Sequence, residues 1–262
     1  MSALSSGLEE RRAGGRKLLV PYVMGGQPDR DSFPRILAAV SRSADALEVG
    51  LPYSDPLMDG PVIAAAGERS IRAGVGPSEA LELVAEAGGK SLRVIMTYYN
   101  PIHSAGEESF CAATIKAGVS GLIVPDLPLE ESEGLRRAAA DQGLAWIPLV
   151  APTSSPARVA AIAATATGFV YAVSTLGVTG TREQLSERAA AVASACKEAT
   201  DLAVLVGIGV SSPEHAHAAA LYSDGVVVGS AVVRLVAESG AEGAAAFLAE
   251  VRAALDEAAG TA

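Results

Sequence analysis

Two carboxylates beside one predicted strand are the residues in this sequence whose types and spacing indicate chemistry. Glu48 stands in the middle of the apolar segment 46–50, which otherwise has the composition of a buried strand. An ionised carboxylate in such a strand costs several kcal/mol unless it is paired or solvated. Asp59 follows in the loop 54–61, which brings a second acid back to the end of the strand. Two acids meeting there indicate proton transfer.

The two acids are expected to lie in different environments. Glu48 alternates with Leu47 and Val49, so its side chain points opposite to theirs, toward the enclosed side of the sheet. Burial there raises the pKa of a carboxyl and lets it donate and accept a proton near neutral pH. Asp59 lies on a proline-bounded loop that could close over a ligand, but Asp before Gly60 is also a common turn pair. Its local sequence leaves both interpretations open.

Short runs rich in Val, Ile and Leu recur along the whole chain and have to position these acids. Between them lie stretches with helical periodicity, such as residues 79–87 and 131–141. Strands that alternate with helices predict a parallel sheet. Eight such units without a linker predict a single α/β domain over residues 1–262, a (β/α)8 TIM barrel with a short helical extension at about 1–16. An open doubly wound sheet is the alternative. The predicted strands span residues 18–23, 46–49, 92–97, 121–125, 146–151, 168–174, 203–209 and 225–229.

Three glycine-containing loops at the predicted mouth of the barrel favour a phosphate ligand. Barrel active sites lie at the carboxyl ends of the strands, and phosphate commonly binds after strands seven and eight. Those loops are residues 207–213 and 229–231, and a third, 177–180, lies beside them. Ser212 before Pro213 is typical of a helix N-cap followed by proline. The backbone N–H groups and helix dipoles at such positions attract an anion.

Neither the lysines nor the histidines are placed for catalysis. Two lysines precede strands one and three, at the far end of the barrel, and two fall in outer helices, so a Schiff base is not expected. Two histidines share an outer helix but not a face, and the third is typical of a surface group, so no metal site is expected. Tyr98 and Tyr171 end strands three and six, where a hydroxyl could reach the mouth. The residues set aside are Lys17, Lys90, Lys116, Lys197, His103, His215 and His217.

Composition excludes several other classes of function. The net charge of −10 argues against nucleic acid or an anionic membrane surface as a partner. Half of the residues are hydrophobic and only 4% are aromatic, which favours helices packed on parallel strands. Cys111 and Cys196 are too few and too far apart for a disulfide framework or a metal site. Without an apolar run that resembles a signal peptide or a membrane span, we expect a cytoplasmic protein.

Several motifs in the chain resemble one family, the α subunit of tryptophan synthase. The most specific is LEVGLPYSDP at residues 47–56, followed by DGPVI at 59–63. Supporting motifs are MTYYNP at 96–101, GLIVPDLP at 121–128 and GVTG at 177–180. Together they extend the resemblance over nearly the whole chain.

This resemblance implies the retro-aldol cleavage of indole-3-glycerol phosphate to indole and glyceraldehyde 3-phosphate. It implies that Glu48 is the general acid and base, which protonates the ring carbon bearing the side chain and then assists loss of the proton from the adjacent glycerol hydroxyl. Asp59 would hold the indole N–H and stabilise the positive charge on the ring, and Tyr171 would pack near Glu48 and the substrate. The implied phosphate contacts are Gly180, Gly209, Gly229 and Ser230, and the implied indole pocket is lined by Tyr22, Tyr98 and Leu127.

A protein partner is also implied by the resemblance. The family's β subunit carries pyridoxal phosphate and receives indole through a tunnel, so an α2β2 complex is expected and no cofactor or metal is expected on this chain. The positions that match the family's β-facing loops are Pro52, Asp55, Pro56 and Asn100.

Departures from the family pattern cluster near the same loops. They are Met24, Met58, Ala64 and Thr175, and none of them removes an acid or a phosphate glycine. Two alternatives therefore stay open beside the α subunit. One is a stand-alone lyase that releases indole for another pathway, and the other is a mainly regulatory subunit that activates a partner.

Overall fold

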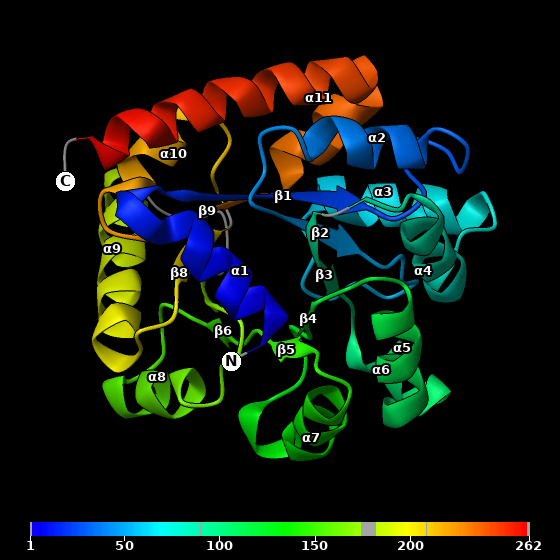
Figure 1. Ribbon diagram of the computed structural model, residues 1–262, viewed down its shortest axis with the longest axis horizontal. Coiled ribbons are helices and arrows are strands. Elements are labelled where there is room, and N and C mark those ends of the chain that lie inside the picture. Colours follow the sequence, from blue (N-terminus) through cyan, green and yellow to red (C-terminus); the bar gives the residue numbers. More distant parts are fainter. Residues whose placement is uncertain (1, 90, 174–181, 208, 261–262) are drawn as a thin grey trace.

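Within the residues that the computed structural model describes, 2–89, 91–173, 182–207 and 209–260, nine parallel strands form one sheet (Figure 1). Their order is β5-β4-β3-β2-β1-β9-β8-β7-β6. The strands are β1 (Leu18–Met24), β2 (Ala46–Gly50), β3 (Leu92–Met96), β4 (Gly121–Ile123), β5 (Ala145–Trp146), β6 (Leu149–Val150), β7 (Val170–Val173), β8 (Val204–Gly207) and β9 (Gly225–Val228).

The two edge strands, β5 and β6, belong to one short segment, and this closes the sheet into a barrel. β5 pairs with β4, and β6 pairs with β7. Between them, Ile147 N–H donates to the Leu122 carbonyl at 3.0 Å and the Pro148 carbonyl accepts from Tyr171 N–H at 3.1 Å. Because Pro148 has no N–H, the expected strand 146–151 is divided in two. The predicted (β/α)8 barrel is confirmed, with its fifth strand in two pieces.

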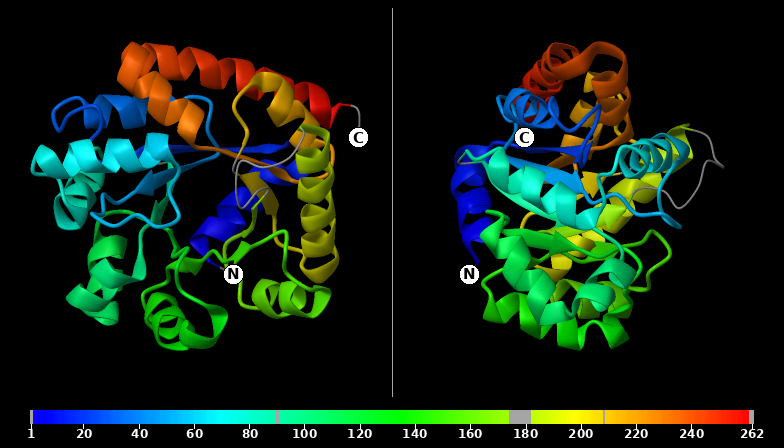
Figure 2. Two further views of the ribbon diagram at one scale, coloured as in Figure 1. Left: turned by 180° about the vertical axis from the view of Figure 1, so that it is seen from behind. Right: turned by 90° about the vertical axis from the view of Figure 1, so that its right-hand side faces the viewer.

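Helices follow the strands and cover the outside of the sheet (Figures 1 and 2). Proline opens four of them, where its missing N–H leaves no helical bond unmade. They are α1 (Ala3–Arg12), α2 (Phe33–Val40), α3 (Pro61–Arg72), α4 (Pro77–Glu86), α5 (Tyr99–Ala105), α6 (Glu107–Lys116), α7 (Glu133–Asp141), α8 (Pro156–Ala163), α9 (Arg182–Ala199), α10 (Pro213–Ala220) and α11 (Ser230–Ala259), with 3-10 turns η1 (Ala13–Gly15) and η2 (Leu129–Glu131). None of the helices in the described ranges is long and apolar enough to cross a membrane.

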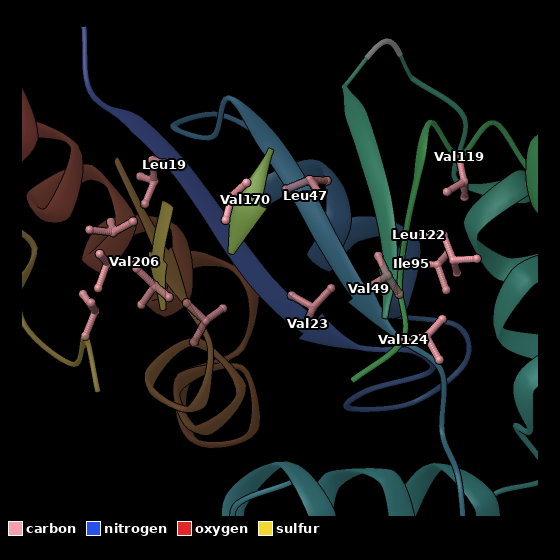
Figure 3. Packing of buried hydrophobic residues seen from close by; sticks show 14 of the residues in the cluster. Leu19, Val23, Leu47, Val49, Ile95, Val119, Leu122, Val124, Val170 and Val206 are labelled. Carbon is pink, nitrogen blue, oxygen red and sulfur yellow. The ribbon is translucent and has the colours of Figure 1, made fainter. Parts of the chain in front are cut away.

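Alternate residues of each strand face the helices or the barrel interior, as the pleat requires. Leu47 and Val49 of β2 belong to the large cluster that packs under the surrounding helices (Figure 3). On the other face, Leu18 and Val20 of β1 belong to a cluster that fills the barrel interior. Glu48, between Leu47 and Val49, therefore points into the barrel, as its alternation predicts.

Helix α1 lies across one end of the barrel, where the strands begin (Figure 2). Its Leu4 and Leu8 are fully buried and join the interior cluster. A Cβ at Gly121 or Gly168 would stand 2.7 or 3.0 Å from the Leu4 side chain, so these glycines make room for the helix. The helix closes the amino-terminal end of the barrel, and α1 with η1 occupies the range where a helical extension is expected. The opposite end remains for a site.

Candidate active site at the carboxyl ends of the strands

Glu48 is a buried carboxyl at the centre of the barrel mouth. Its Cα pairs in register with Tyr22 of β1 and Val94 of β3, and 1% of its surface is exposed. Its Oε2 has no hydrogen-bond partner among the described residues. Burial first, and then the charge of Asp59, raise the pKa of Glu48 to about 8. At neutral pH this carboxyl therefore holds a proton that it can give to a ligand.

Asp59 is held beside the mouth by Tyr98. The Tyr98 O–H donates to Asp59 Oδ1 at 3.1 Å, and its oxygen accepts the Met58 N–H at 2.9 Å. Burial raises the pKa of Asp59, and the hydrogen bond from Tyr98 opposes that rise. The structure thus brings together the two acids that the sequence singled out. They lie in different environments, since Asp59 is half-buried and bonded to a donor and Glu48 is enclosed.

Two buried tyrosines lie near Glu48, Tyr22 on the neighbouring strand β1 and Tyr171 on β7, which is not adjacent to β2 in the sheet. Tyr22 lies over Gly50, where a Cβ would stand 1.8 Å from the tyrosine oxygen, and Tyr171 lies over Gly207, where the distance would be 2.2 Å. Burial is the main cause that raises the pKa of both phenols, and the charge of Glu48 adds to it. Both therefore stay neutral near pH 7. Glycines at the ends of β2 and β8 make this packing possible.

An apolar cluster around Tyr22 forms one wall of the mouth, and apart from Tyr22 sequence reasoning missed its members as site residues. Tyr22 and Met24 pack with Ala66 and Val233, and half-buried side chains from β3 and α3 lie against this cluster. Those side chains are Val62, Ile63 and Met96. The alternation that places Val94 inward also places Met96 inward two residues later, so this signal was present in the sequence.

The predicted phosphate loops lie at the carboxyl ends of β8 and β9. Gly209 has φ 102°, a backbone conformation that favours glycine, and Ser230 opens α11 directly after Gly229. A Cβ at Gly229 would lie 3.9 Å from the Tyr22 side chain, which places this loop beside the mouth. Ser212 caps α10 by accepting the His215 N–H at 3.3 Å, as predicted. Gly180 and Thr175 lie outside the described residues.

Leu127 is not brought together with Tyr22 and Tyr98. It packs half-buried against the helix-facing cluster and lines a cavity of about 230 Å³ with Trp146 and Arg158. The residue of that segment that faces the interior is Ile123, which shares a cluster with Tyr171. Leu127 follows the end of β4, where the strand alternation no longer holds, so its direction was not readable from the pattern.

The loops expected to face a partner lie beside Asp59 and Tyr98. Asp55 and Asn100 are exposed and Pro56 is half-buried, whereas Pro52 is buried. Asn100 donates to the Tyr53 hydroxyl at 2.8 Å, and the Tyr53 ring lies 5.3 Å from that of Tyr98. Leu57 and Met58 add exposed apolar surface, with 78% and 54% of their areas accessible.

The described lysines lie away from the acids. Lys17 donates to the Ser223 carbonyl and Lys197 to Asp224, both 2.9 Å away, on the side where β1 and β9 begin. Lys116 is in the outer helix α6, and Lys90 lies outside the described residues. None of the described lysines therefore lies beside Glu48 or Asp59.

Comparisons with known proteins agree with this geometry. The family model described as tryptophan synthase alpha chain matches residues 8–260. The tryptophan synthase alpha chain of Synechococcus elongatus is 43% identical over 260 residues, 98% of this chain and 98% of the relative. That of Carboxydothermus hydrogenoformans is 45% identical over 239 residues, 90% of each.

Solved structures show the same likeness in three dimensions. Tryptophan synthase subunit alpha from Legionella pneumophila has a TM-score of 0.90 at 31% identity, over 98% of this chain and 99% of that chain. A chain of tryptophan synthase from M. tuberculosis, in its aminoacrylate-bound form, has a TM-score of 0.87 at 37% identity, over 97% and 100%. The chain belongs to the tryptophan synthase alpha chain family, whose lyase reaction cleaves indole-3-glycerol phosphate to indole and glyceraldehyde 3-phosphate.

Proposed function

We propose that Glu48 and Asp59 carry out the cleavage of indole-3-glycerol phosphate in this chain. One observation carries the proposal: a buried carboxyl with a pKa near 8 lies at the mouth of the barrel beside a second acid in a different environment. Such a pair supplies a proton donor and an anion in the same pocket at neutral pH. Membership of the family supports the choice of substrate.

The reaction begins with proton transfer from Glu48. Its carboxyl protonates the ring carbon that bears the glycerol side chain, and the ring becomes positively charged. Ionised Asp59 accepts a hydrogen bond from the ring N–H and stabilises that charge. The ionised Glu48 then takes the proton of the adjacent glycerol hydroxyl. The carbonyl forms, the carbon–carbon bond breaks, and its electron pair neutralises the ring, which releases indole and regenerates the protonated acid.

The remaining residues bind and shape the substrate in this proposal. Gly209, Gly229 and Ser230, together with Gly180, hold the phosphate through backbone N–H groups and a hydroxyl at the start of α11. Tyr22 and Tyr98 line the indole pocket, and Tyr171 packs against Glu48 and the substrate. Leu127 was expected in the pocket from the resemblance, but its place against the helix-facing cluster favours Ile123 as the residue that lines the interior there.

The proposal includes a β subunit that carries pyridoxal phosphate and receives the indole in an α2β2 complex. The exposed side chains of Asp55, Leu57, Met58 and Asn100 supply a surface for it. On this view the chain itself uses neither cofactor nor metal, and its cytoplasmic setting stays a prediction. Of the departures, Met58 lies in the same loop as Asp55, whereas Met24 ends β1 and Ala64 lies in α3. Together they keep a stand-alone lyase as the second candidate.

The test is indole release from indole-3-glycerol phosphate by the purified chain, with and without a tryptophan synthase β subunit. Weak cleavage that rises strongly with the β subunit supports the biosynthetic α subunit. Fast cleavage whose rate is the same with and without the β subunit supports the stand-alone lyase. Glu48→Gln is the control for the site: normal turnover in this variant would refute the role proposed for the two acids.

A further inference from the structure

The Tyr98 hydroxyl makes two hydrogen bonds to the loop that carries Asp59. It donates to Oδ1 of the carboxylate at 3.1 Å and accepts the backbone N–H of Met58 at 2.9 Å. One phenol therefore holds both the side chain and the preceding peptide. The other carboxylate oxygen of Asp59 takes no part in these bonds.

The loop is anchored at its start, where Leu51 N–H donates to the Met96 carbonyl and the Tyr53 hydroxyl accepts from Asn100, but around Asp59 few bonds hold it. Residues 51–60 contain no regular secondary structure, and two of their backbone bonds are short-range turns, Leu57 N–H to Asp55 and Asp59 N–H to Pro56. Leu57 and Met58 are exposed. A loop of this kind samples several conformations unless a side chain from a rigid element holds it.

Tyr98 is part of such a rigid element. Only 3% of its surface is exposed, and it stands at the N-cap position of α5, two residues after the last residue of β3. The next peptide is fixed as well, because Tyr99 N–H donates to Asp126 at 2.9 Å. Tyr53, at the anchored start of the same loop, packs its ring against that of Tyr98, 5.3 Å between centroids, and its hydroxyl accepts from Asn100. The hydroxyl is thus presented from a fixed position to a loosely held acid.

We propose that Tyr98 is a positioning residue for the cleavage: its hydroxyl holds Oδ1 of Asp59 and leaves Oδ2 as the oxygen that accepts the ring N–H of the substrate. This inference rests on the proposed role of Asp59. It assigns to Tyr98 a function through the carboxylate, beyond the apolar contact of its ring with the substrate.

The electrostatics of Asp59 also support a positioning role for the Tyr98 hydroxyl. Burial raises the pKa of its carboxyl, and the charge-assisted hydrogen bond from Tyr98 lowers it again. The phenol therefore favours the anion that is needed to stabilise a cationic ring. Without the hydroxyl, the carboxylate would lose both its fixed direction and part of its preference for the ionised form.

The experiment is Tyr98→Phe, which keeps the ring and removes the hydroxyl. Because Asp59 acts on the charged transition state, we expect kcat to fall by about tenfold to a hundredfold, the range for a hydrogen bond to a charged group, with a much smaller change in KM. The acid limb of the kcat/KM profile should move to higher pH. A 13C NMR titration of the Asp59 carboxyl should show the same rise in pKa without any substrate.

Two further variants separate positioning from packing. In an Asp59→Asn background, Tyr98→Phe should cause little additional loss, since the residue acts through the carboxylate. Tyr99→Phe is the matched control: it removes a hydroxyl that bonds Glu107 at 2.9 Å, away from the site, and should leave kcat and the pH profile unchanged.

Three results would overturn the inference. These are a Tyr98→Phe enzyme with normal kcat, an equal loss in the Asp59→Asn background, or an Asp59 titration that does not move. Wild-type protein that fails to cleave the substrate with or without a β subunit would instead refute the proposed function. The NMR titration reports on the hydrogen bond in either case, so the two failures are distinguishable.

Discussion

Glu48 shows how one position can combine a structural cost with a chemical use. The carboxyl is enclosed by β1, β2 and β3, and burial together with the charge of Asp59 raises its pKa to about 8. The same environment that penalises the anion keeps a proton ready at neutral pH. Asp59, half-buried and bonded to Tyr98, is better suited to remain ionised. The two roles follow from where the acids lie.

The pH dependence of cleavage follows from these two environments. Glu48 has to start protonated and Asp59 ionised. A plot of kcat/KM against pH should therefore be bell-shaped, with its alkaline limb near pH 8. The two carboxyls interact, so the two limbs report apparent pKa values of the pair. The measurement is a pH–rate profile of indole release at low substrate concentration. A rate that stays constant from pH 7 to pH 10 would contradict the assignment of Glu48.

The free energy of unfolding should depend on pH because of the same carboxyl. The pKa of Glu48 is raised from 4.5 to about 8 in the folded state, so between these values the folded chain keeps a proton that the unfolded chain has lost. The free energy of unfolding therefore falls with rising pH across this window, at up to about 1.4 kcal/mol per pH unit for this group, and levels off above it.

Glu48→Gln removes this titration and should gain stability relative to wild type as the pH rises from 5 to 8. Urea denaturation at pH 5, 6.5 and 8 measures the difference. The exposed Glu82→Gln is the control for the loss of one carboxyl from the surface. A constant difference between Glu48→Gln and wild type at all three pH values would show that burial does not perturb Glu48.

At the scale of elements, the site depends on large side chains of one strand that lie over glycines of the next. Tyr22 of β1 covers Gly50 of β2, and Tyr171 of β7 covers Gly207 of β8. In each pair the phenol lies at the mouth of the barrel, over the strand next to the one that carries the tyrosine. The glycines are required for space, since neither has a positive φ.

Gly50→Ala should therefore destabilise the barrel by about 1–3 kcal/mol, the usual cost of overpacking, and reduce cleavage because Tyr22 is displaced. Chemical denaturation and indole release measure the two effects. Adding Tyr22→Leu should restore part of the stability, since the new methyl group meets the tyrosine oxygen and ring. Gly60→Ala is the matched control for stability, because a Cβ there meets nothing within 4 Å. Equal stability of Gly50→Ala and Gly60→Ala would contradict the packing.

At the scale of the whole molecule, the barrel is closed at one end and open at the other. Leu4 and Leu8 of α1 fill the amino-terminal end and belong to the cluster that contains Tyr171. The acids and the predicted phosphate loops share the carboxyl end. The packing of α1 onto the barrel therefore stabilises the interior cluster that lies beneath the site.

Leu8→Ala should lower the free energy of unfolding by about 2–5 kcal/mol, as expected for a buried leucine in a closed core. Urea denaturation is the measurement, with the exposed Glu10→Ala on the same helix as control. Equal stabilities of the two variants would show that α1 does not contribute to the core.

Much of the fold of this protein could be predicted from local patterns in the sequence. A pleated strand alternates with a period of two, so the direction of Glu48 and the inward face of each strand follow from neighbouring residues. The recurrence of strand and helix predicts the barrel, and the barrel puts the site at the carboxyl ends. The motif around Glu48 and Asp59 was sufficient to indicate the family, which the comparisons confirmed.

Only the tertiary structure decided how distant segments meet. That Tyr98 binds Asp59, that Tyr22 lies over Gly50, and that Leu127 faces away from the interior depend on strand register and on loops without a period. Such contacts join residues far apart in sequence, and no local propensity encodes their relative position. The sequence by itself therefore predicted the succession of strands and helices and the direction of Glu48, because both rest on short-range alternation. The structure decided that the sheet closes and which residues contact each acid, because those rest on packing.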